Sequence, residues 1–279
     1  MNLLNKKIII IDNSSLSYTG EDIEGTVVRG TETSLILLAE QFVKIGIEVD
    51  YCNSISNLKK INGVNYFHKN KIDKSYIYDL AIVISDANEF YRVSSIKKAV
   101  FSNSNQPIEK FIRKKQLLPF LKFKPILITL CEYQYKKRSF FTSFYGKKTI
   151  PITVDPKFLN IDIDTNHLPE RKVVYNIRSN RNLDRLIKIW CEKIFPINNE
   201  FKLFITPNII DYKDHHFNNN IFLRNIGSRS QMINELNDYR ALTYLGHKSD
   251  IFTLTAEEAI KLCLPVVTFG IGSLRERVT

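Results

Sequence analysis

Apolar positions along this chain alternate between short continuous runs and runs with helical spacing. Lys7–Asp12 is an unbroken apolar run ending in a carboxylate, which is typical of a strand buried inside a parallel sheet. Thr33–Lys44 carries apolar side chains at the spacing of one helix face, Gly46 ends that helix, and Ile47–Tyr51 resumes as a strand. This βαβ unit predicts a parallel sheet with right-handed crossovers.

The same alternation continues to residue 152. Strands are expected at Leu80–Ile84, Ala99–Phe101, Ile126–Leu130 and Thr149–Ile152. Two basic helices are expected at Ile108–Leu118 and Glu132–Tyr145.

Periodicity fades in the polar, turn-rich stretch Asp155–Glu170, which is the best candidate for a linker. A second α/β series follows, with strands at Val173–Asn176, Phe201–Ile205, Ile221–Arg224, Ala241–Tyr244 and Pro265–Phe269, and helices at Leu183–Glu192, Ser230–Leu236 and Thr255–Leu262. We therefore expect an α/β fold of two Rossmann-like, doubly wound domains, residues 1–160 and 161–279, facing a cleft. Because the chain stops directly after a strand and a turn, the second domain is expected to be truncated at its C-terminus.

Composition places the chain among ordinary globular proteins. Of its 279 residues, 44% are hydrophobic and 25% charged, which excludes disorder. The N-terminus lacks the features of a signal peptide, so a cytoplasmic protein is expected. No C-x-x-C spacing occurs, and free, buried thiols are expected at Cys52, Cys131, Cys191 and Cys263.

The chain is strongly basic. Its 40 lysines and arginines outnumber 29 acidic residues, giving a net charge of +11. Such a surface favours nucleic acid, anionic lipid or phosphorylated metabolites as partners. The joint richness in Lys, Asn and Ile is also the signature of an A+T-rich genome, so the charge alone leaves both explanations open.

Two arginines stand where a ligand of a parallel sheet would bind. Arg178 and Arg181 follow a strand and precede a helix, so they lie near the carboxyl end of that strand. Two guanidiniums there can clamp a diphosphate. The competing interpretation is a pair of solvated loop arginines.

Two carboxylates are separated by seven residues in the second half. Asp250 lies in a predicted turn, and Glu258 falls in the first turn of the following helix if that helix begins near Thr255. Carboxylates in these positions can accept hydrogen bonds from sugar hydroxyls. The neighbouring Glu257 illustrates the alternative, since acidic residues favour helix N-termini for dipole reasons alone.

Three further features are candidates for ligand contacts. Gly272 and Ser273 lie in a loop after a buried strand, where backbone N–H groups suit phosphate, although an ordinary tight turn is the more common explanation of a lone Gly-x-Gly. Gly30, before the first helix, would let a substrate approach the backbone. His247 adjoins the proposed sugar site.

Taken together, these segments resemble the GT-B glycosyltransferases of the retaining family-four group. That family carries a Glu-x7-Glu motif, a helix, Pro-Val-Val and a glycine loop ending in Glu. Corresponding spacings are occupied here by Asp250, Glu258, Pro265–Val267, Gly272 and Glu276. Arg178–Leu183 is similar to the family's Arg-x-x-Arg-Gly-Leu segment, and Ile150–Asp155 to its interdomain hinge. Asp250 replaces the first Glu, and Asn182, Thr153 and Ser273 replace glycines.

The resemblance implies metal-independent transfer of a sugar, with retention, from a nucleotide-sugar donor to a glycan or lipid-linked acceptor in cell-surface polysaccharide biosynthesis. Arg178 and Arg181 would neutralise the leaving diphosphate, Asp250 would hold sugar hydroxyls, and Glu258 the donor ribose. Gly272, Ser273, His247 and Gly30 complete the expected donor site.

No cofactor beyond the nucleotide-sugar co-substrate, no metal and no nucleic acid is expected, and Asp162-Ile163-Asp164 is interpreted as a solvated turn. An anionic membrane surface is a further expected partner, at the inner face of the plasma membrane. Two alternatives stay open: an inactive or truncated transferase-like protein, and a basic nucleic-acid-binding or scaffold protein.

Overall fold

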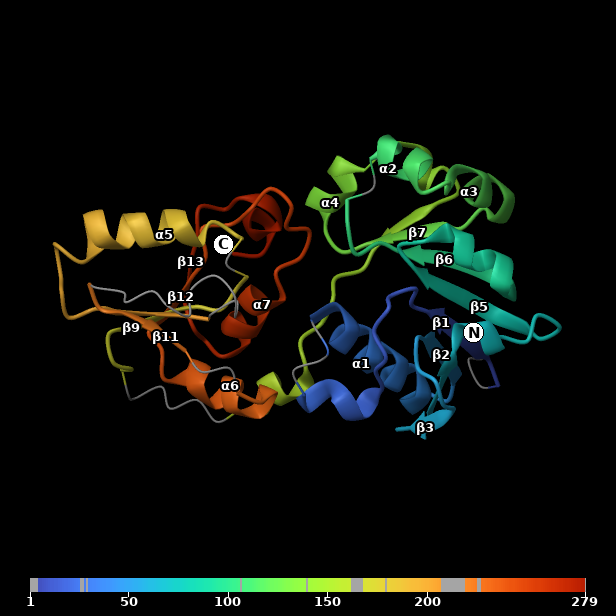
Figure 1. Cartoon of the computed structure of the whole chain (residues 1–279), viewed down its shortest axis with the longest axis horizontal. Helices are drawn as coiled ribbons and strands as arrows, with labels where there is room; N and C mark the ends of the chain where they lie inside the picture. Colours follow the sequence, from blue (N-terminus) through green and yellow to red (C-terminus); the bar gives the residue numbers. More distant parts are fainter. Residues whose placement is uncertain are drawn as a thin grey trace. The chain divides into compact units, whose positions relative to one another are not determined.

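The chain folds into two α/β units, Met1–Ile152 and Thr153–Thr279 (Figure 1). The computed structural model describes residues 5–25, 28, 30–105, 107–138, 140–161, 168–178, 180–206, 219–224 and 227–278. The division lies eight residues before the expected boundary at residue 160. The residues just after Ile152 belong to the second unit because Val154 and Phe158 are buried in one apolar cluster with Leu236 of that unit.

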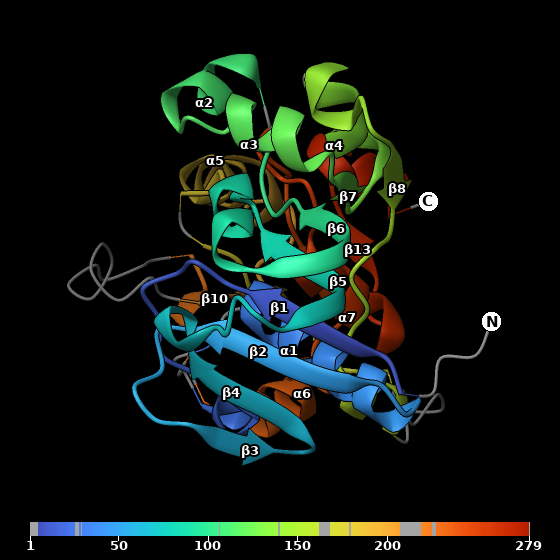
Figure 2. The same ribbon diagram turned by 90° about the vertical axis from the view of Figure 1, so that its right-hand side faces the viewer.

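The first unit is built on an eight-stranded sheet with the order β3-β4-β2-β1-β5-β6-β7-β8. Every neighbouring pair is parallel except β3 and β4, which are antiparallel. Figure 2 shows the strands from β3 to β6 side by side in this order. The strands are β1 Lys7–Ile11, β2 Glu48–Asn53, β3 Lys59–Ile61, β4 Val64–His68, β5 Ile77–Ile84, β6 Ser94–Phe101, β7 Ile126–Thr129 and β8 Lys147–Thr149.

Four α-helices accompany this sheet: α1 Gly30–Lys44, α2 Ile108–Arg113, α3 Leu117–Phe123 and α4 Glu132–Lys137. Short 3-10 turns lie at Gly20–Glu24, Lys69–Lys71, Ala87–Arg92 and Phe140–Ser143. α1 is the crossover between β1 and β2, as the sequence pattern predicted.

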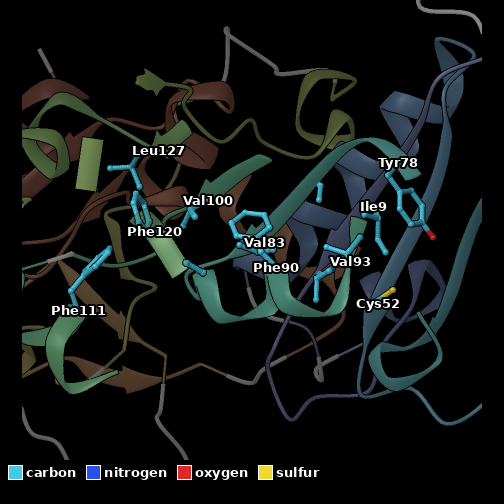
Figure 3. Close-up of a cluster of buried hydrophobic side chains, with 13 residues drawn as sticks. Ile9, Cys52, Tyr78, Val83, Phe90, Val93, Val100, Phe111, Phe120 and Leu127 are labelled. Carbon is cyan, nitrogen blue, oxygen red and sulfur yellow. The ribbon is translucent and has the colours of Figure 1, made fainter. Parts of the chain in front are cut away.

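The core of the first unit follows from the apolar run at its start. β1 pairs with β2 on one side and β5 on the other, and its four isoleucines are at most 4% exposed. A continuous apolar strand suits this central place because both of its faces are covered. Figure 3 shows one side of the core, where Phe111 and Phe120 from the helices meet Val100 and Leu127 from the strands.

The β3–β4 hairpin is absent from the sequence prediction. Its two-residue turn is Asn62–Gly63, with both residues at positive φ of 50° and 82°. This dipeptide is a strong signal for a type I′ hairpin turn. β3 is short and rich in lysine, and β4 has only five residues, so neither is long enough to give a clear apolar alternation.

Two predicted helices of the first unit are shorter than expected. The stretch Ile108–Leu118 breaks into α2 and α3 around Lys115, whose φ is +53°. Pro119 gives the reason, because proline fits only the first turn of a helix and so requires a new helix to begin just before it. The helix expected over Glu132–Tyr145 ends at Lys137.

The second unit has a five-stranded, fully parallel sheet with the order β11-β10-β9-β12-β13. The strands are β9 Lys172–Tyr175, β10 Lys202–Ile205, β11 Ile221–Leu223, β12 Ala241–Thr243 and β13 Val266–Val267. The helices are α5 Leu183–Ile189, continued by a π-helical turn at Trp190–Ile194, α6 Arg229–Asn237 and α7 Leu254–Lys261. Single 3-10 turns lie at Pro156–Leu159 and Gly272–Glu276. Both units are therefore parallel α/β layers, as predicted.

No helix in the described ranges is long and apolar enough to cross a membrane. The four cysteines are free, and Cys52 and Cys131 are buried as expected. Cys263 is exposed, so the prediction of burial is wrong for this residue. It follows the last turn of α7, where its own φ is +54°. Cys191 is partly exposed.

Candidate active site

The candidate site of the second unit lies at the carboxyl ends of two neighbouring strands. β9 and β12 pair in parallel through Ala241 with Val173 and Leu242 with Val174. The segments that follow them, 176–182 and 244–250, therefore leave the sheet at the same edge. Asn182 joins the two segments, because its side-chain Nδ2 donates to the carbonyl oxygen of Gly246 at 2.5 Å.

The side chain of Arg181 lies against the second of these segments. Its Nη1 is 2.8 Å from Nδ1 of His247, and its Nε is 3.5 Å from Oδ1 of Asp250. The Arg181 and Asp250 side chains are 23% and 11% exposed. Within the described part of the chain, the remaining guanidinium nitrogen, Nη2, has no protein hydrogen bond. Arg181 is thus held in place while part of its donor capacity stays available to a ligand.

These contacts also define the tautomer of His247. Its Nδ1 faces two donors, the guanidinium of Arg181 and the backbone N–H of Ser249 at 3.1 Å. Since Nδ1 accepts, the neutral ring carries its proton on Nε2. The predicted place of His247 beside Asp250 agrees with this geometry.

Tyr175 holds the turn that carries the two arginines. Its hydroxyl lies 2.8 Å from the carbonyl oxygen of Arg178 and 3.0 Å from that of Arg181. The ring is fully buried at the end of β9, so a rigid strand end positions the turn. Arg178 itself is exposed, and its carbonyl oxygen also accepts from the backbone N–H of Arg181 at 3.0 Å. Among the described residues, side-chain contacts fix Arg181, and the clamp of two arginines stays a prediction.

Asp250 is positioned by two donors. The buried hydroxyl of Tyr244 donates to Oδ2, and the backbone N–H of His247 donates to the same oxygen at 3.0 Å. Burial and the adjacent carboxylate of Asp250 raise the pKa of Tyr244 well above its usual range. The phenol therefore stays protonated and remains a donor to Asp250.

Gly272 and Ser273 pack under this loop and are buried. Gly272 has φ of +73°, and a Cβ there would lie 2.4 Å from the carbonyl oxygen of His247. The backbone N–H of Ser273 donates to the carbonyl oxygen of Asp250 at 3.1 Å. That N–H is therefore occupied within the protein, in place of the free phosphate donor expected from sequence. These two residues shape the loop that carries Asp250.

Glu258 belongs to a different cluster from Arg181. α7 begins at Leu254, so Glu258 stands in its second turn and not in the expected first turn. Its Oε1 is 3.0 Å from Nη2 of Arg229, whose Nε is 3.0 Å from Oδ2 of Asp155. The first-turn acid Glu257 pairs instead with Arg277.

This second cluster is buried and carries two acids for one base. The Arg229 side chain is 12% exposed, and both carboxylate side chains are 5% exposed. Burial raises the pKa of Glu258, whereas the charge and hydrogen bond of Arg229 act to lower it. The structure thus keeps the expected ribose-binding carboxylate next to a cation that holds it in the interior.

The remaining expected residues do not join either cluster. Gly30 begins α1 in the first unit, where its carbonyl oxygen accepts from the Ser34 hydroxyl at 2.7 Å. Asp162, Ile163 and Asp164 lie outside the described residues. No group of three or more His, Cys, Asp and Glu side chains able to hold a metal ion occurs in the described part of the chain.

Arg229 was not among the residues expected from the sequence, although it pairs with Asp155 and Glu258. A signal was present, since Ala256 and Ala259 flank the two glutamates of α7 and favour burial of one helix face. A glutamate on such a face needs a cation partner. The partner could not be identified because Arg229 is 29 residues away in the chain.

No family model matches the sequence, and no curated protein matches it. Solved structures do. Sucrose-phosphate synthase from Thermosynechococcus elongatus has a TM-score of 0.70 at 11% identity, covering 98% of this chain and 83% of its own. AviGT4, a glycosyltransferase of avilamycin A biosynthesis, gives 0.62 at 12% identity, with 97% and 81% covered. An Escherichia coli trehalose-6-phosphate structure gives 0.58 at 10% identity, with 94% and 84% covered.

These similarities extend over nearly the whole chain and include both α/β units. At this level of identity they establish the architecture. The chain therefore has the two-domain GT-B fold of these glycosyltransferases.

Proposed function

We propose that this protein is a glycosyltransferase that moves a sugar from a nucleotide-sugar donor to an acceptor hydroxyl with retention and without a metal. The observation that carries the proposal is Arg181, held between Asp250 and His247 at the carboxyl ends of β9 and β12. In open α/β sheets, ligands bind beyond the carboxyl ends of the strands. A partly exposed guanidinium there suits a diphosphate.

In the proposed reaction, the bond between the anomeric carbon and the diphosphate oxygen breaks, and the diphosphate leaves with the electron pair. The acceptor oxygen then bonds to the anomeric carbon, and its proton passes to the departing phosphate. Arg181 stabilises the negative charge that develops on the diphosphate. Asp250, fixed by Tyr244 and by a backbone N–H, accepts hydrogen bonds from the transferred sugar.

The donor class is supported by a structure that shares this fold. The E. coli trehalose-6-phosphate structure is bound with UDP-2-fluoro glucose. We propose a nucleotide sugar as donor here, a glycan or lipid-linked acceptor, and a role in cell-surface polysaccharide biosynthesis. The cytoplasm and the inner face of the plasma membrane are the proposed location.

A binding protein without turnover is the second candidate, and the cluster around Arg229 favours it. Glu258, the expected ribose contact, already forms an ion pair with Arg229. If Glu258 keeps its ion pair with Arg229 when a nucleotide binds, the contact between Glu258 and the donor ribose is lost. Such a protein would bind a nucleoside diphosphate but would release none from its sugar conjugates.

A thermal-shift screen over nucleoside diphosphates and their sugar conjugates tests the proposal. A ligand at 100 times its Kd adds about 2.7 kcal/mol to the stability of the unit that binds it, which raises Tm by several degrees. Arg181→Ala should remove most of this rise.

Arg171→Ala is the matched control, because Arg171 precedes the opposite, amino end of β9 and is 45% exposed. The rise should persist in this variant. No shift with any nucleotide, or equal losses in both variants, would contradict the proposal. Product analysis with the best donor then separates a transferase from a binding protein.

A further inference from the structure

The net positive charge of the chain is concentrated in one segment of the first unit. Between residues 108 and 148, eleven lysines and arginines face only two glutamates, so this segment carries nine of the eleven net charges. Residues 1–107 contain twelve basic and twelve acidic side chains. A genome-wide bias toward lysine would enrich the whole chain evenly, so it does not account for this distribution.

The segment folds into α2, α3, α4, the turn Phe140–Ser143 and the edge strand β8. Figures 1 and 2 both place the three helices together at the end of the unit beyond β6 and β7. Nine of its eleven basic side chains are exposed. The first unit therefore presents a positive surface at this end.

Large apolar side chains are exposed among these cations. The most exposed are Leu118 at 73%, Phe140 at 72%, Phe144 at 65%, Ile112 at 61% and Leu121 at 48%. We call these five side chains and the nine exposed cations the basic apolar surface. The cations are Arg113, Lys114, Lys115, Lys122, Lys124, Lys136, Lys137, Lys147 and Lys148.

Packing of the core does not require the exposed apolar side chains. Phe111 and Phe120 of α2 and α3 belong to the buried cluster, and each is 2% exposed, while Phe123 packs against it (Figure 3). Ile112 and Leu121 stand next to them in sequence and point about 100° away around each helix. The helices thus have a second apolar face toward solvent.

Contacts within the unit join the apolar and basic parts. Phe144 and Tyr145 line a shallow apolar pocket of about 120 Å³ with Leu117, Leu121 and the two core phenylalanines. The ammonium of Lys124 lies 5.9 Å from the centre of the Tyr145 ring. The Nζ of Lys147 and the Cζ of Arg138 lie 3.6 and 4.1 Å from the centre of the Tyr135 ring.

We propose that the basic apolar surface docks the first unit on an anionic phospholipid bilayer. Lysine and arginine side chains are attracted to the negative headgroups, and the exposed leucine, isoleucine and phenylalanine side chains enter the boundary between headgroups and acyl chains. Both contributions are needed, since charge alone would equally suit nucleic acid. Aliphatic side chains such as Leu118 and Ile112 gain nothing from a phosphate backbone, so the bilayer is the occupant that fits this surface.

Vesicle co-sedimentation tests the proposal with the intact chain. The protein should bind vesicles of phosphatidylglycerol and phosphatidylcholine, bind weakly or not at all to phosphatidylcholine alone, and dissociate as salt rises. Each cation near an anionic bilayer strengthens the partition about fivefold, so Arg113→Gln with Lys114→Gln should weaken it roughly 30-fold. Leu118→Ser should weaken it about tenfold through lost apolar burial.

Matched controls lie elsewhere in the same unit. Leu58 is 71% exposed and Leu58→Ser removes an equally exposed leucine. Lys71 and Lys74 are exposed, and Lys71→Gln with Lys74→Gln removes the same charge. Both control variants should bind vesicles like the wild type. Circular dichroism and thermal unfolding like those of the wild type show that every variant is folded.

Three results would overturn the proposal. They are equal binding to neutral and anionic vesicles, test variants that bind like their controls, and binding to a random DNA duplex without binding to vesicles. The assay does not depend on sugar transfer. Its failure would remove the proposed location at the plasma membrane but leave the proposed sugar transfer intact, and a protein without nucleotide affinity could still bind vesicles.

Discussion

Replacing Arg229 by methionine is the sharpest test of how the second unit is stabilised. The substitution keeps much of the apolar stem but leaves Asp155 and Glu258 as two buried carboxylates without their shared cation. Removing one partner of a buried ion pair typically costs 3–5 kcal/mol, because a charge stays buried and uncompensated. We expect about 4 kcal/mol, or roughly a thousandfold in the folding equilibrium.

The loss should depend on pH in a defined direction. Burial already raises the pKa of Glu258, and Arg229 opposes that rise. Without Arg229 the folded variant retains a proton that the unfolded chain releases above the ordinary glutamate pKa of about 4.3. Folded protein then binds more protons than unfolded protein, so stability falls as pH rises through this window. The deficit of the variant should therefore be larger at pH 8 than at pH 5.

Urea unfolding at the two pH values measures this deficit. Lys188→Met is the matched control, because its pair with Glu192 spans 3.9 Å and its side chain is 72% exposed. Exposed pairs of this kind contribute only about 0.5 kcal/mol. The double variant Arg229→Met with Glu258→Gln should regain part of the loss. A deficit for Arg229→Met no larger than that of the control, or one that does not change with pH, would show that Arg229 does not compensate the two buried carboxylates.

Two further substitutions test the loop that carries Asp250. Gly272→Ala should cost about 3 kcal/mol or more in urea unfolding, since it adds left-handed strain of roughly 1–2 kcal/mol to a Cβ that meets the carbonyl oxygen of His247. Gly270→Ala is its control, with φ of +64° but no atom nearer than 3.9 Å, and should cost only the strain; equal costs would contradict the packing argument. Tyr244→Phe should cost about 1–3 kcal/mol by removing a buried donor to a carboxylate, and an unchanged free energy of unfolding would show that Asp250 does not depend on it.

Most of the fold could be predicted from apolar patterning. The run Lys7–Ile11 and the βαβ unit after it specify a parallel sheet because continuous apolar strands must be covered on both faces. The β3–β4 hairpin could not be predicted from apolar patterning because its strands have three and five residues, although Asn62–Gly63 signals its turn. The break between α2 and α3 is explained by Pro119. The prediction of one continuous helix followed the helical periodicity and did not take this proline into account.

The candidate site could be predicted only in part. Arg181, His247 and Asp250 follow the ends of neighbouring strands, and the sheet order brings them together as the sequence suggested. The buried cluster around Glu258 could not be predicted, because Arg229 is 29 residues from Glu258 and 74 from Asp155, and the three meet only in the folded unit. The hydrogen bond from the Ser273 N–H to the carbonyl oxygen of Asp250 could not be predicted either. It depends on the close approach of Gly272 to the backbone of His247, which a side chain at position 272 would prevent.

The most direct test of the proposed active site is a calorimetric titration with a nucleoside diphosphate and with its parent nucleoside. If Arg181 neutralises the diphosphate, Arg181→Ala should weaken binding of the diphosphate roughly 10- to 100-fold and leave binding of the nucleoside unchanged. Equal affinities of wild type and variant for the diphosphate, or equal losses for both ligands, would contradict the account.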